Sequence, residues 1–282
     1  MAESIIITAA AEMQARSREL LRSEKSIGFV PTMGALHAGH QALIDRARRE
    51  NDIVIVSIYV NPTQFGPDED FKNYPRAFDV DKKKCDAAGV DYLFAPATLY
   101  DQNARAFVLV GELEEALCGI SRPGHFRGVA TVVTKLLCIV RPDRAYFGWK
   151  DAQQLIIIQK LVRDLNLGCE IVPCEIVRES DGLALSSRNR YLSVSERKQA
   201  LALSKALNYC RDQIEHGERD AMNLLREMTK ILALEPNIEI DYVAIVDAHT
   251  LQDLKILSGD VLVALAVKIG ATRLIDNARF EC

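Results

Sequence analysis

Short apolar runs alternate with helix-like segments over about the first 175 residues, and this alternation constrains the fold more than any other feature of the chain. The apolar runs lie at 26–32, 53–60, 92–96, 107–110, 144–148 and 170–177. Between them, apolar residues recur at helical spacing, most clearly at 126–140 with an i, i+3, i+4, i+7 stripe. Strands separated by helices favour a parallel sheet, because each parallel connection needs a crossover. We predict an α/β fold whose sheet is covered by helices on both faces.

The pattern changes after a polar loop at 178–190. Two helical patterns, at 203–214 and 221–233, are followed by strand-like runs at 238–247 and 261–270. Helices that precede strands in this way are typical of a small α+β domain. We therefore predict two domains, comprising residues 1–177 and residues 178–282.

Composition narrows the class of protein. The 282 residues are 49% hydrophobic and 26% charged, with a formal net charge of −4. Mild acidity argues against a nucleic-acid partner, and no apolar segment has the length needed to cross a bilayer. The N-terminus lacks the pattern of a secretory signal, and the seven cysteines show no CxxC spacing. These features favour a cytoplasmic protein with free thiols.

The sharpest local motif is PTMGALHAGH at 31–40, where a strand ends and a helix is predicted to begin near His37. His37 and His40 are three residues apart and would share one helix face, where the N–H groups and the dipole favour an anion. Gly34 and Gly39 would let a nucleotide approach the backbone. Two alternatives stay open: the histidines fill the first turn without a function, or they bind zinc, although no third ligand lies nearby in sequence.

Two further polar segments directly follow predicted strands, at the sheet edge where ligands bind in such folds. GWKDAQQ, which begins at the end of run 144–148, brings the charge of Lys150 to a helix start and offers the amides of Gln153 and Gln154. NPTQFG follows the run at 53–60, and its Gln64 could bind a small polar acid. The ordinary alternatives are a helix cap with a solvated charge and a simple turn.

The polar loop carries a third candidate, the sequence LSSRN. The hydroxyls of Ser186 and Ser187 with the guanidinium of Arg188 suit a phosphate clamp, although an ordinary polar linker has the same composition. His125 lies between two arginines just before a predicted helix, which suggests anion binding. There is no Walker A sequence, no GxGxxG after a strand, no HExxH and no GxSxG.

Taken together, these segments resemble those of pantoate–β-alanine ligases, also called pantothenate synthetases. The matching segments are PTMGALHAGH, NPTQFGP, GWKDAQQL and DGLALSSRNRYL, with RPGHFRGVATVV and YPR in addition. They occur in the family's order and approximate spacing, and the resemblance covers essentially the whole chain.

The resemblance implies a Rossmann-like nucleotidyltransferase domain with an HxGH signature, and a smaller C-terminal α+β domain that covers ATP. It implies homodimers in the cytoplasm that use ATP with Mg²⁺. It also implies two chemical steps. Pantoate's carboxylate attacks the α-phosphorus of ATP to give pantoyl adenylate and pyrophosphate, and the amine of β-alanine then displaces AMP.

The resemblance also assigns site residues, with His40 as the catalytic proton donor. It assigns Gln64 to pantoate and β-alanine, and Gln154 to pantoate. It assigns ATP contacts to Met33, Gly34, Ala35, Leu36, His37, Ala38, Gly39, His40, Gly148, Trp149, Lys150, Asp151, Val177, Leu185, Ser186, Ser187 and Arg188. Many relatives have a polar residue in place of Trp149. Val80 interrupts a pair of acids found in relatives, so the protein ligands of Mg²⁺ stay unassigned.

Two rival interpretations remain at this stage. Another HxGH nucleotidyltransferase would share the ATP loop but lack NPTQF together with KDAQQ. A non-catalytic zinc module would use His37 and His40 as metal ligands. The favoured partners are the small molecules pantoate, β-alanine and ATP, with neither a nucleic acid nor a membrane.

Overall fold

The computed structural model describes residues 3–67 and 69–282. These residues form two units, which are described separately below. The first comprises the described residues up to Glu114 together with Arg122–Gly148 and Ile157–Glu175. The second comprises Glu115–Ser121, Trp149–Ile156 and Ile176–Cys282.

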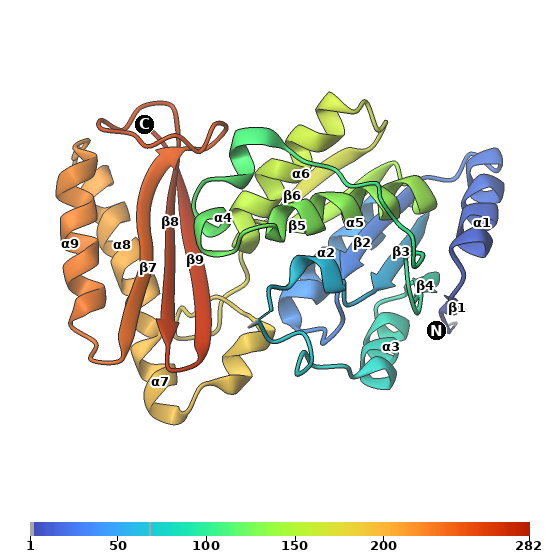
Figure 1. The fold of residues 1–282 in the computed structure, drawn as a ribbon, viewed down its shortest axis with the longest axis horizontal. Coiled ribbons are helices and arrows are strands. Elements are labelled where there is room, and N and C mark those ends of the chain that lie inside the picture. The colour runs from blue at the N-terminus through green and yellow to red at the C-terminus, as the bar shows by residue number, and fades with distance from the viewer. Residues whose placement is uncertain (1–2, 68) are drawn as a thin grey trace. The chain divides into compact units, whose positions relative to one another are not determined.

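Six parallel strands form the sheet of the first unit, in the order β1-β4-β3-β2-β5-β6 (Figure 1). The strands are β1 (Ile5–Ile7), β2 (Ile27–Thr32), β3 (Ile53–Ile58), β4 (Tyr92–Phe94), β5 (Arg144–Gly148) and β6 (Glu170–Cys174). The sequence of β3, IVIVSI, is almost entirely apolar because strands with helices on both faces have no solvent side. The predicted parallel sheet is confirmed.

Helices cover both faces of this sheet. They are α1 (Ala10–Arg22), α2 (Ala38–Glu50), α3 (Phe78–Ala87), α5 (His125–Val140) and α6 (Ala152–Asp164). On one face, Ile44 of α2 and Cys85 of α3 pack in one cluster with Val54 of β3. Phe29 and Ile55 occupy alternate strand positions and are fully buried on the other face, where α5 contacts β2 and also packs against α1. The predicted stripe at 126–140 is confirmed as α5, most of whose residues are buried.

The strand order places the loops that matter for function. From β2 the chain runs outward through β3 and β4, whereas β5 lies on the other side of β2 and leads to β6. The direction of winding therefore reverses between β2 and β5. The carboxyl ends of parallel strands share one edge, and a crevice forms where the winding reverses. The loops that follow β2 and β3 lie at this edge, as does Gly148 at the end of β5.

The prediction of a strand at 107–110 is wrong, because these residues have no regular secondary structure. Phe107 and Leu109 are 60% and 65% exposed, and the N–H of Val108 donates to Oγ1 of Thr131 on α5 instead of to a strand. The last predicted strand of this unit is shorter than expected and ends at Cys174. Apolar content alone does not make a strand; a backbone partner is also needed.

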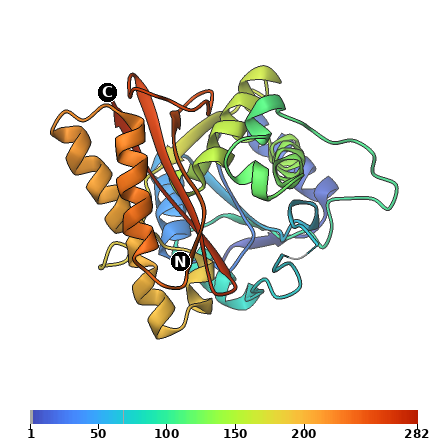
Figure 2. The ribbon, with the colours of Figure 1, turned by 60° about the vertical axis from the view of Figure 1, so that its left-hand side comes forward.

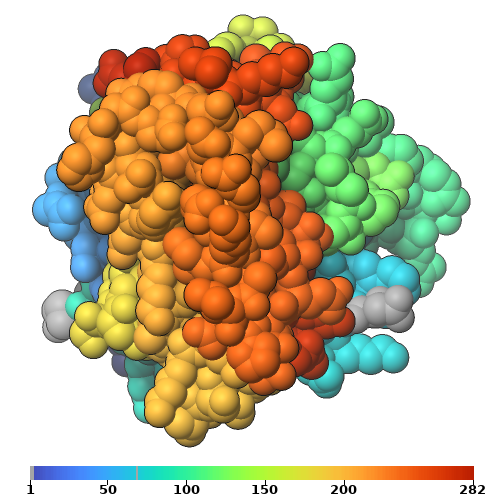
Figure 3. Space-filling model, turned by 90° about the vertical axis from the view of Figure 1, so that its left-hand side faces the viewer, coloured from blue at the N-terminus to red at the C-terminus, as the bar shows by residue number. Residues whose placement is uncertain are grey.

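The second unit contains an antiparallel sheet in the order β7-β8-β9, formed by Ile238–Asp247, Asp260–Ile269 and Thr272–Glu281. Helices α8 (Leu201–Glu215) and α9 (Ala221–Ala233) lie side by side along one face of it (Figure 2). Their outer surfaces are seen in Figure 3. Leu203 and Leu224 pack with Val263 in the core between helices and sheet. The predicted small α+β unit is confirmed, but β9 was missed because six of its ten residues are polar.

Short elements complete the chain. They are the α-helices α4 (Cys118–Ser121) and α7 (Val194–Gln199), and the 3₁₀ helices η1 (Pro62–Gln64), η2 (Gly111–Glu114), η3 (Trp149–Asp151) and η4 (Ser187–Tyr191). All seven cysteines are free thiols. Over the described ranges 3–67 and 69–282, no helix is both long and apolar enough to cross a membrane.

Candidate active site

The loop after β2 is clamped by helix α3. Gly34 and Ala35 have φ angles of 81° and 52°, so two successive residues are left-handed. The carboxylate of Asp81, only 1% exposed, accepts the N–H groups of Ala35 at 2.7 Å and Leu36 at 2.8 Å. One turn later in α3, Lys84 donates to the carbonyl of Leu36. These contacts hold a conformation that would otherwise be strained at Ala35.

The two histidines of the motif form a capping box at the start of α2. Nδ1 of His37 accepts the N–H of Gly39 at 3.1 Å, and Nδ1 of His40 accepts the N–H of His37 at 3.3 Å. The ring centroids are 4.1 Å apart. Because each Nδ1 is an acceptor, a neutral ring carries its proton on Nε2. The capping interpretation and the functional one are therefore compatible, since the cap orients two imidazoles as Nε2–H donors.

The two glycines of this motif make room for neighbouring side chains. A Cβ at Gly39 would lie 2.8 Å from Cε1 of His37, so this glycine makes room for the imidazole. A Cβ at Gly34 would lie 3.0 Å from Oδ2 of Asp81. The expectation that Gly34 and Gly39 let a nucleotide approach the backbone stays a prediction beside this packing role. Several backbone N–H groups of the segment are already paired within the loop.

Gln64 lies at the end of η1, directly after β3, and is 9% exposed. Its Oε1 accepts from Nδ2 of Asn61 at 3.0 Å, and its Nε2 donates to Sδ of Met33 at 3.3 Å. The contact with Met33 brings two of the predicted segments together at the same sheet edge. Asn61, 1% exposed, also donates to the carbonyl of Gly128 at 3.1 Å. Sequence reasoning missed this orienting role of Asn61.

Helix α5 forms the wall behind this turn. A Cβ at Gly128 would lie 2.3 Å from the carbonyl oxygen of Thr63 and 2.7 Å from Cα of Gln64. Only glycine allows the helix to approach so closely. A glycine inside an apolar helix costs about 1 kcal/mol relative to alanine, so the glycine in RPGHFRGV is itself a sequence signal of close packing.

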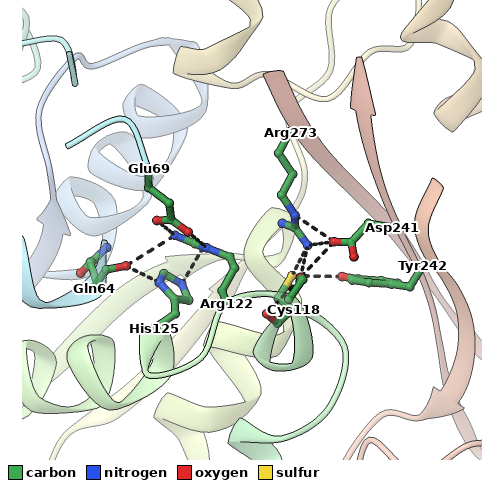
Figure 4. A network of polar contacts seen from close by, with 9 residues as sticks. Gln64, Glu69, Cys118, Arg122, His125, Asp241, Tyr242 and Arg273 are labelled. Carbon is green, nitrogen blue, oxygen red and sulfur yellow. Dashed lines mark hydrogen bonds and ion pairs between the residues drawn. The ribbon is translucent and has the colours of Figure 1, made fainter. Parts of the chain in front are cut away.

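Two polar side chains, Arg122 just before α5 and His125 at its first residue, contact the backbone of Gln64 (Figure 4). A ring nitrogen of His125 lies 2.7 Å from the carbonyl oxygen of Gln64. Arg122 contacts the other ring nitrogen at 2.9 Å and forms an ion pair with Glu69 at 2.7 Å. Arg127 lies over the ring of Phe107. The anion-binding interpretation of His125 is therefore weakened, because the neighbouring guanidinium of Arg122 already forms an ion pair with the carboxylate of Glu69.

In the second unit, Asn277 of β9 fixes the segment that follows β5. Asn277 is 4% exposed, and its Nδ2 donates to the carbonyls of Trp149 at 2.9 Å and Lys150 at 3.1 Å. The guanidinium of Arg279 lies 4.1 Å from the centre of the Trp149 ring. Lys150 and Asp151 form a loose ion pair of 3.6 Å within η3. The predicted helix begins at Ala152, so Asp151 belongs to this 3₁₀ turn.

The two adjacent glutamines of α6 have different surroundings. Gln153 is 5% exposed, and its amide accepts from the N–H of Cys118 at 3.0 Å and donates to the carbonyl of Ala116 at 2.7 Å. It therefore holds the chain at α4. Gln154 is half-buried and is the residue of the pair that the family resemblance would assign to pantoate.

The segment that carries the predicted phosphate clamp begins as a tight hairpin. The N–H of Leu185 donates to the carbonyl of Val177 at 2.9 Å, and Arg178 forms a two-point ion pair with Asp276 of β9 at 2.6 and 2.9 Å. Beyond the hairpin, the hydroxyl of Ser186 caps η4 by accepting the N–H of Arg188 at 3.3 Å. The apparent linker is thus an ordered structure attached to the sheet of the second unit.

Comparison with known proteins decides the family. The family model described as pantoate–β-alanine ligase matches residues 5–279. The chain belongs to the pantoate–β-alanine ligase family. It is 55% identical over 278 residues to a pantothenate synthetase of Heliobacterium modesticaldum, covering 98% of this chain and 99% of that protein. Membership makes the chain an enzyme, a ligase that forms pantothenate.

Solved structures of relatives share the fold. Pantothenate synthetase from Thermus thermophilus has a TM-score of 0.92 at 44% identity, covering 97% of this chain and 98% of that one. Pantoate–β-alanine ligase from Francisella tularensis, solved with beta-gamma ATP and β-alanine, has a TM-score of 0.78 at 35% identity, covering 98% of this chain and 97% of that one. These matches span both units.

Proposed function

We propose that this chain condenses pantoate with β-alanine to give pantothenate, converting ATP to AMP and pyrophosphate through a pantoyl-adenylate intermediate. The observation that carries the proposal is the pair of capped imidazoles, His37 and His40, at the same sheet edge as the amide of Gln64. Phosphate recognition and recognition of a small hydroxy acid are thereby combined. The relative solved with beta-gamma ATP and β-alanine supports these ligands.

In the first step, one oxygen of pantoate's carboxylate attacks the α-phosphorus and pyrophosphate leaves. Such a step needs in-line positioning and stabilisation of phosphate charge more than a protein nucleophile. The Nε2–H group of His40 would donate to a phosphate oxygen, with His37 beside it. The further ATP contacts that we propose are Met33–Ala38, Gly39, Gly148–Asp151, Val177 and Leu185–Arg188.

In the second step, the amine of β-alanine attacks the activated carbonyl, and AMP leaves with the carboxylate oxygen that formed the anhydride. We propose that Gln64 contacts both pantoate and β-alanine and that Gln154 contacts pantoate. A neutral amide suits this task because it can donate to a carboxylate and accept from a hydroxyl. A residue bearing a full charge would hold only one of these groups well.

Mg²⁺ is part of the proposal and would neutralise the phosphates of bound ATP. Asp81 is a poor ligand for it, because both of its oxygens accept backbone N–H groups. Within the described ranges, no group of three or more His, Cys, Asp or Glu side chains could hold a metal ion. We propose that the ion is bound mainly through the phosphates of ATP and water. Family membership, in turn, disfavours the alternative of a zinc module.

Three broader features belong to the same proposal. Residues 1–177 would bind ATP and pantoate, and residues 178–282 would form the domain that covers ATP. The enzyme would act as a homodimer in the cytoplasm. Support for these features is the family membership of the chain.

Product analysis tests the proposed reaction. The purified protein is incubated with ATP, Mg²⁺, pantoate and β-alanine, and pantothenate, AMP and pyrophosphate are quantified by mass spectrometry. We expect the three products in equal amounts, and no pantothenate when any one substrate is omitted. Formation of ADP and phosphate in place of AMP and pyrophosphate would contradict the proposal.

A further inference from the structure

We infer that Glu69, Arg122 and His125 form a positioning relay that holds the backbone of Gln64 and thereby sets the orientation of its amide toward pantoate (Figure 4). The inference rests on the proposed function, because it concerns the binding of one of the proposed substrates. It gives a role to three residues to which the family resemblance assigned none.

The contact between His125 and Gln64 has a defined direction. Nδ1 of His125 lies 2.7 Å from the carbonyl oxygen of Gln64, and a carbonyl oxygen can only accept. Nδ1 is therefore the donor. In the neutral ring Nε2 then has a lone pair, which accepts from Nη1 of Arg122 at 2.9 Å. Both ring nitrogens are committed, and the tautomer of His125 is determined by its neighbours.

Arg122 is held in turn by a carboxylate. Its Nε and Nη2 donate to the two oxygens of Glu69, each at 2.7 Å. The side chains of Arg122 and Glu69 are only 16% and 26% exposed. Burial alone would raise the pKa of Glu69, but the hydrogen bonds and charge of Arg122 bring that pKa below its ordinary value. Glu69 therefore stays ionised, and the two-point contact fixes the plane of the guanidinium.

Gln64 depends on such external contacts because its own turn is weak. η1 spans only Pro62–Gln64, and the bond that closes it, from the N–H of Phe65 to the carbonyl of Pro62, is 3.4 Å long. A three-residue 3₁₀ turn with so long a bond does not fix its backbone by itself. His125 donates a hydrogen bond to the backbone carbonyl of Gln64, whereas Asn61 and Met33 contact its side-chain amide. The relay therefore controls the direction in which the side chain leaves the backbone.

The first test compares two substitutions at His125. His125→Leu removes the donor at similar volume, and we expect the KM for pantoate to rise about tenfold, the loss of one net hydrogen bond, with kcat and the KM for ATP unchanged. His125→Asn keeps a donor at the position of Nδ1 and should recover most of the loss. His216→Leu is the matched control, because its Nδ1 also contacts a carbonyl, that of Asp212 at 2.6 Å, at the exposed end of α8.

The second test separates positioning from direct substrate contact by a double-mutant cycle. If His125 acts through the amide of Gln64, His125→Leu should raise the KM for pantoate less than about twofold when introduced into Gln64→Ala. A full tenfold effect in that background would show that His125 touches the substrate itself and would overturn the inference. An unchanged KM in His125→Leu alone would overturn it as well.

Glu69→Gln provides an independent probe should His125→Leu not fold, as judged by circular dichroism. It keeps the shape of the side chain and removes the charge that orients Arg122, so the KM for pantoate should rise about threefold, again with kcat unchanged. No change in Glu69→Gln would contradict the relay. Failure of the proposed function is distinguishable, because the unsubstituted enzyme would then form no pantothenate.

Discussion

His40 has two separable roles, because its ring nitrogens make different kinds of hydrogen bond. Nδ1 accepts the N–H of His37 and caps α2, whereas Nε2 carries the proton that we assign to catalysis. His40→Asn should keep an acceptor for the cap and lose the Nε2 donor. We expect the rate of pyrophosphate release to fall about 100- to 1,000-fold with the melting temperature nearly unchanged.

The exposed His249→Asn is the control for His40→Asn and should retain full activity. A folded His40→Asn enzyme with the unsubstituted rate of pyrophosphate release would remove His40 from the mechanism. A large loss of melting temperature would instead show that the ring is needed mainly for the cap.

Gln153 and Gln154 are neighbours with opposite expected phenotypes. Gln154→Ala should weaken pantoate binding about tenfold and leave ATP binding unchanged, since one or two hydrogen bonds to the acid are lost. Gln153→Ala should leave affinities alone but lower stability by about 1–3 kcal/mol, because Ala116 and Cys118 lose their buried partner. Calorimetric titration and thermal unfolding measure the two effects. The assignment of Gln154 fails if ATP binding weakens more than pantoate binding.

The reactive residues were easier to predict from the sequence than the residues that hold them. His37 and His40 stood out through local spacing at a strand end. Asp81 did not stand out, because its carboxylate accepts a hydrogen bond from the N–H of Ala35, which lies 46 residues earlier in the sequence. The side chain of Asn277 donates to the carbonyl of Lys150, which lies 127 residues earlier in the sequence. Such pairings form only when the chain folds, so no local pattern contains them.

At the scale of elements, the contact between α5 and η1 leaves no room for a side chain at Gly128. Gly128→Ala places a methyl group against the backbone of Thr63, where no side chain can rotate away. We expect a loss of about 1–3 kcal/mol in the free energy of unfolding, the usual cost of overpacking, and a raised KM for pantoate because η1 moves. Urea unfolding and steady-state kinetics measure these effects.

Cys138→Ala, at an exposed position of the same helix, is the control for Gly128→Ala and should change neither quantity. If Gly128→Ala lost stability while pantoate kinetics stayed normal, the turn would be shown to adjust without moving the amide of Gln64.

Asp86 joins α3 to the start of β1 in a pH-dependent way. It accepts from Lys82 and from both the hydroxyl and N–H of Ser4, and these contacts lower its pKa from 3.8 to about 2. A lowered folded-state pKa stabilises the fold above the unfolded value and loses that effect as the pH falls through the folded value. Asp86→Asn should therefore be less stable at pH 7 by up to about 1 kcal/mol, and the difference should vanish between pH 4 and pH 2.

Urea unfolding at a series of pH values measures this dependence, with the exposed Asp101→Asn as control. If the difference in the free energy of unfolding between Asp86→Asn and the unsubstituted protein did not depend on pH, the carboxylate charge would contribute nothing to the contact between α3 and the start of β1.

Long periodic elements were predictable, whereas β1 and the irregular course of residues 107–110 were not. The stripe of α5 identified that helix within one residue of its start, because burial of one face requires regular spacing. β1 has three residues, too few for any period to appear. The run at 107–110 has the composition of a strand, yet Val108 pairs with a side chain of α5. Whether an apolar run becomes a strand depends on a partner that local sequence does not reveal.

At the scale of the whole molecule, the proposed intermediate sets a requirement for shielding. An acyl adenylate is a mixed anhydride that water hydrolyses, so the enzyme must exclude water until β-alanine arrives. We propose that the hairpin and η4, residues 178–190, provide the cover. Arg178 is tied to Asp276 of β9, so this segment should move together with the sheet of its unit and not as a free loop.

The order of the two steps gives the last prediction. The segments assigned to the site contain no cysteine, so we expect the activated acyl group to remain as bound pantoyl adenylate. Enzyme with Mg²⁺, ATP and pantoate alone should release pyrophosphate in a burst of about one per site, followed by slow turnover, because the anhydride is shielded. A rapid-quench time course with and without β-alanine measures this burst.

Isotope labelling extends this experiment to the fate of the oxygen atom. With pantoate labelled by ¹⁸O in its carboxylate, one labelled oxygen should appear in AMP during full turnover, because that oxygen bridges carbon and phosphorus in the intermediate. β-Alanine should be needed for AMP release but not for the burst. Pyrophosphate formation that depends strictly on β-alanine would contradict a free-standing adenylation step. Label found in inorganic phosphate, with ADP as the co-product, would establish an acyl-phosphate mechanism in its place.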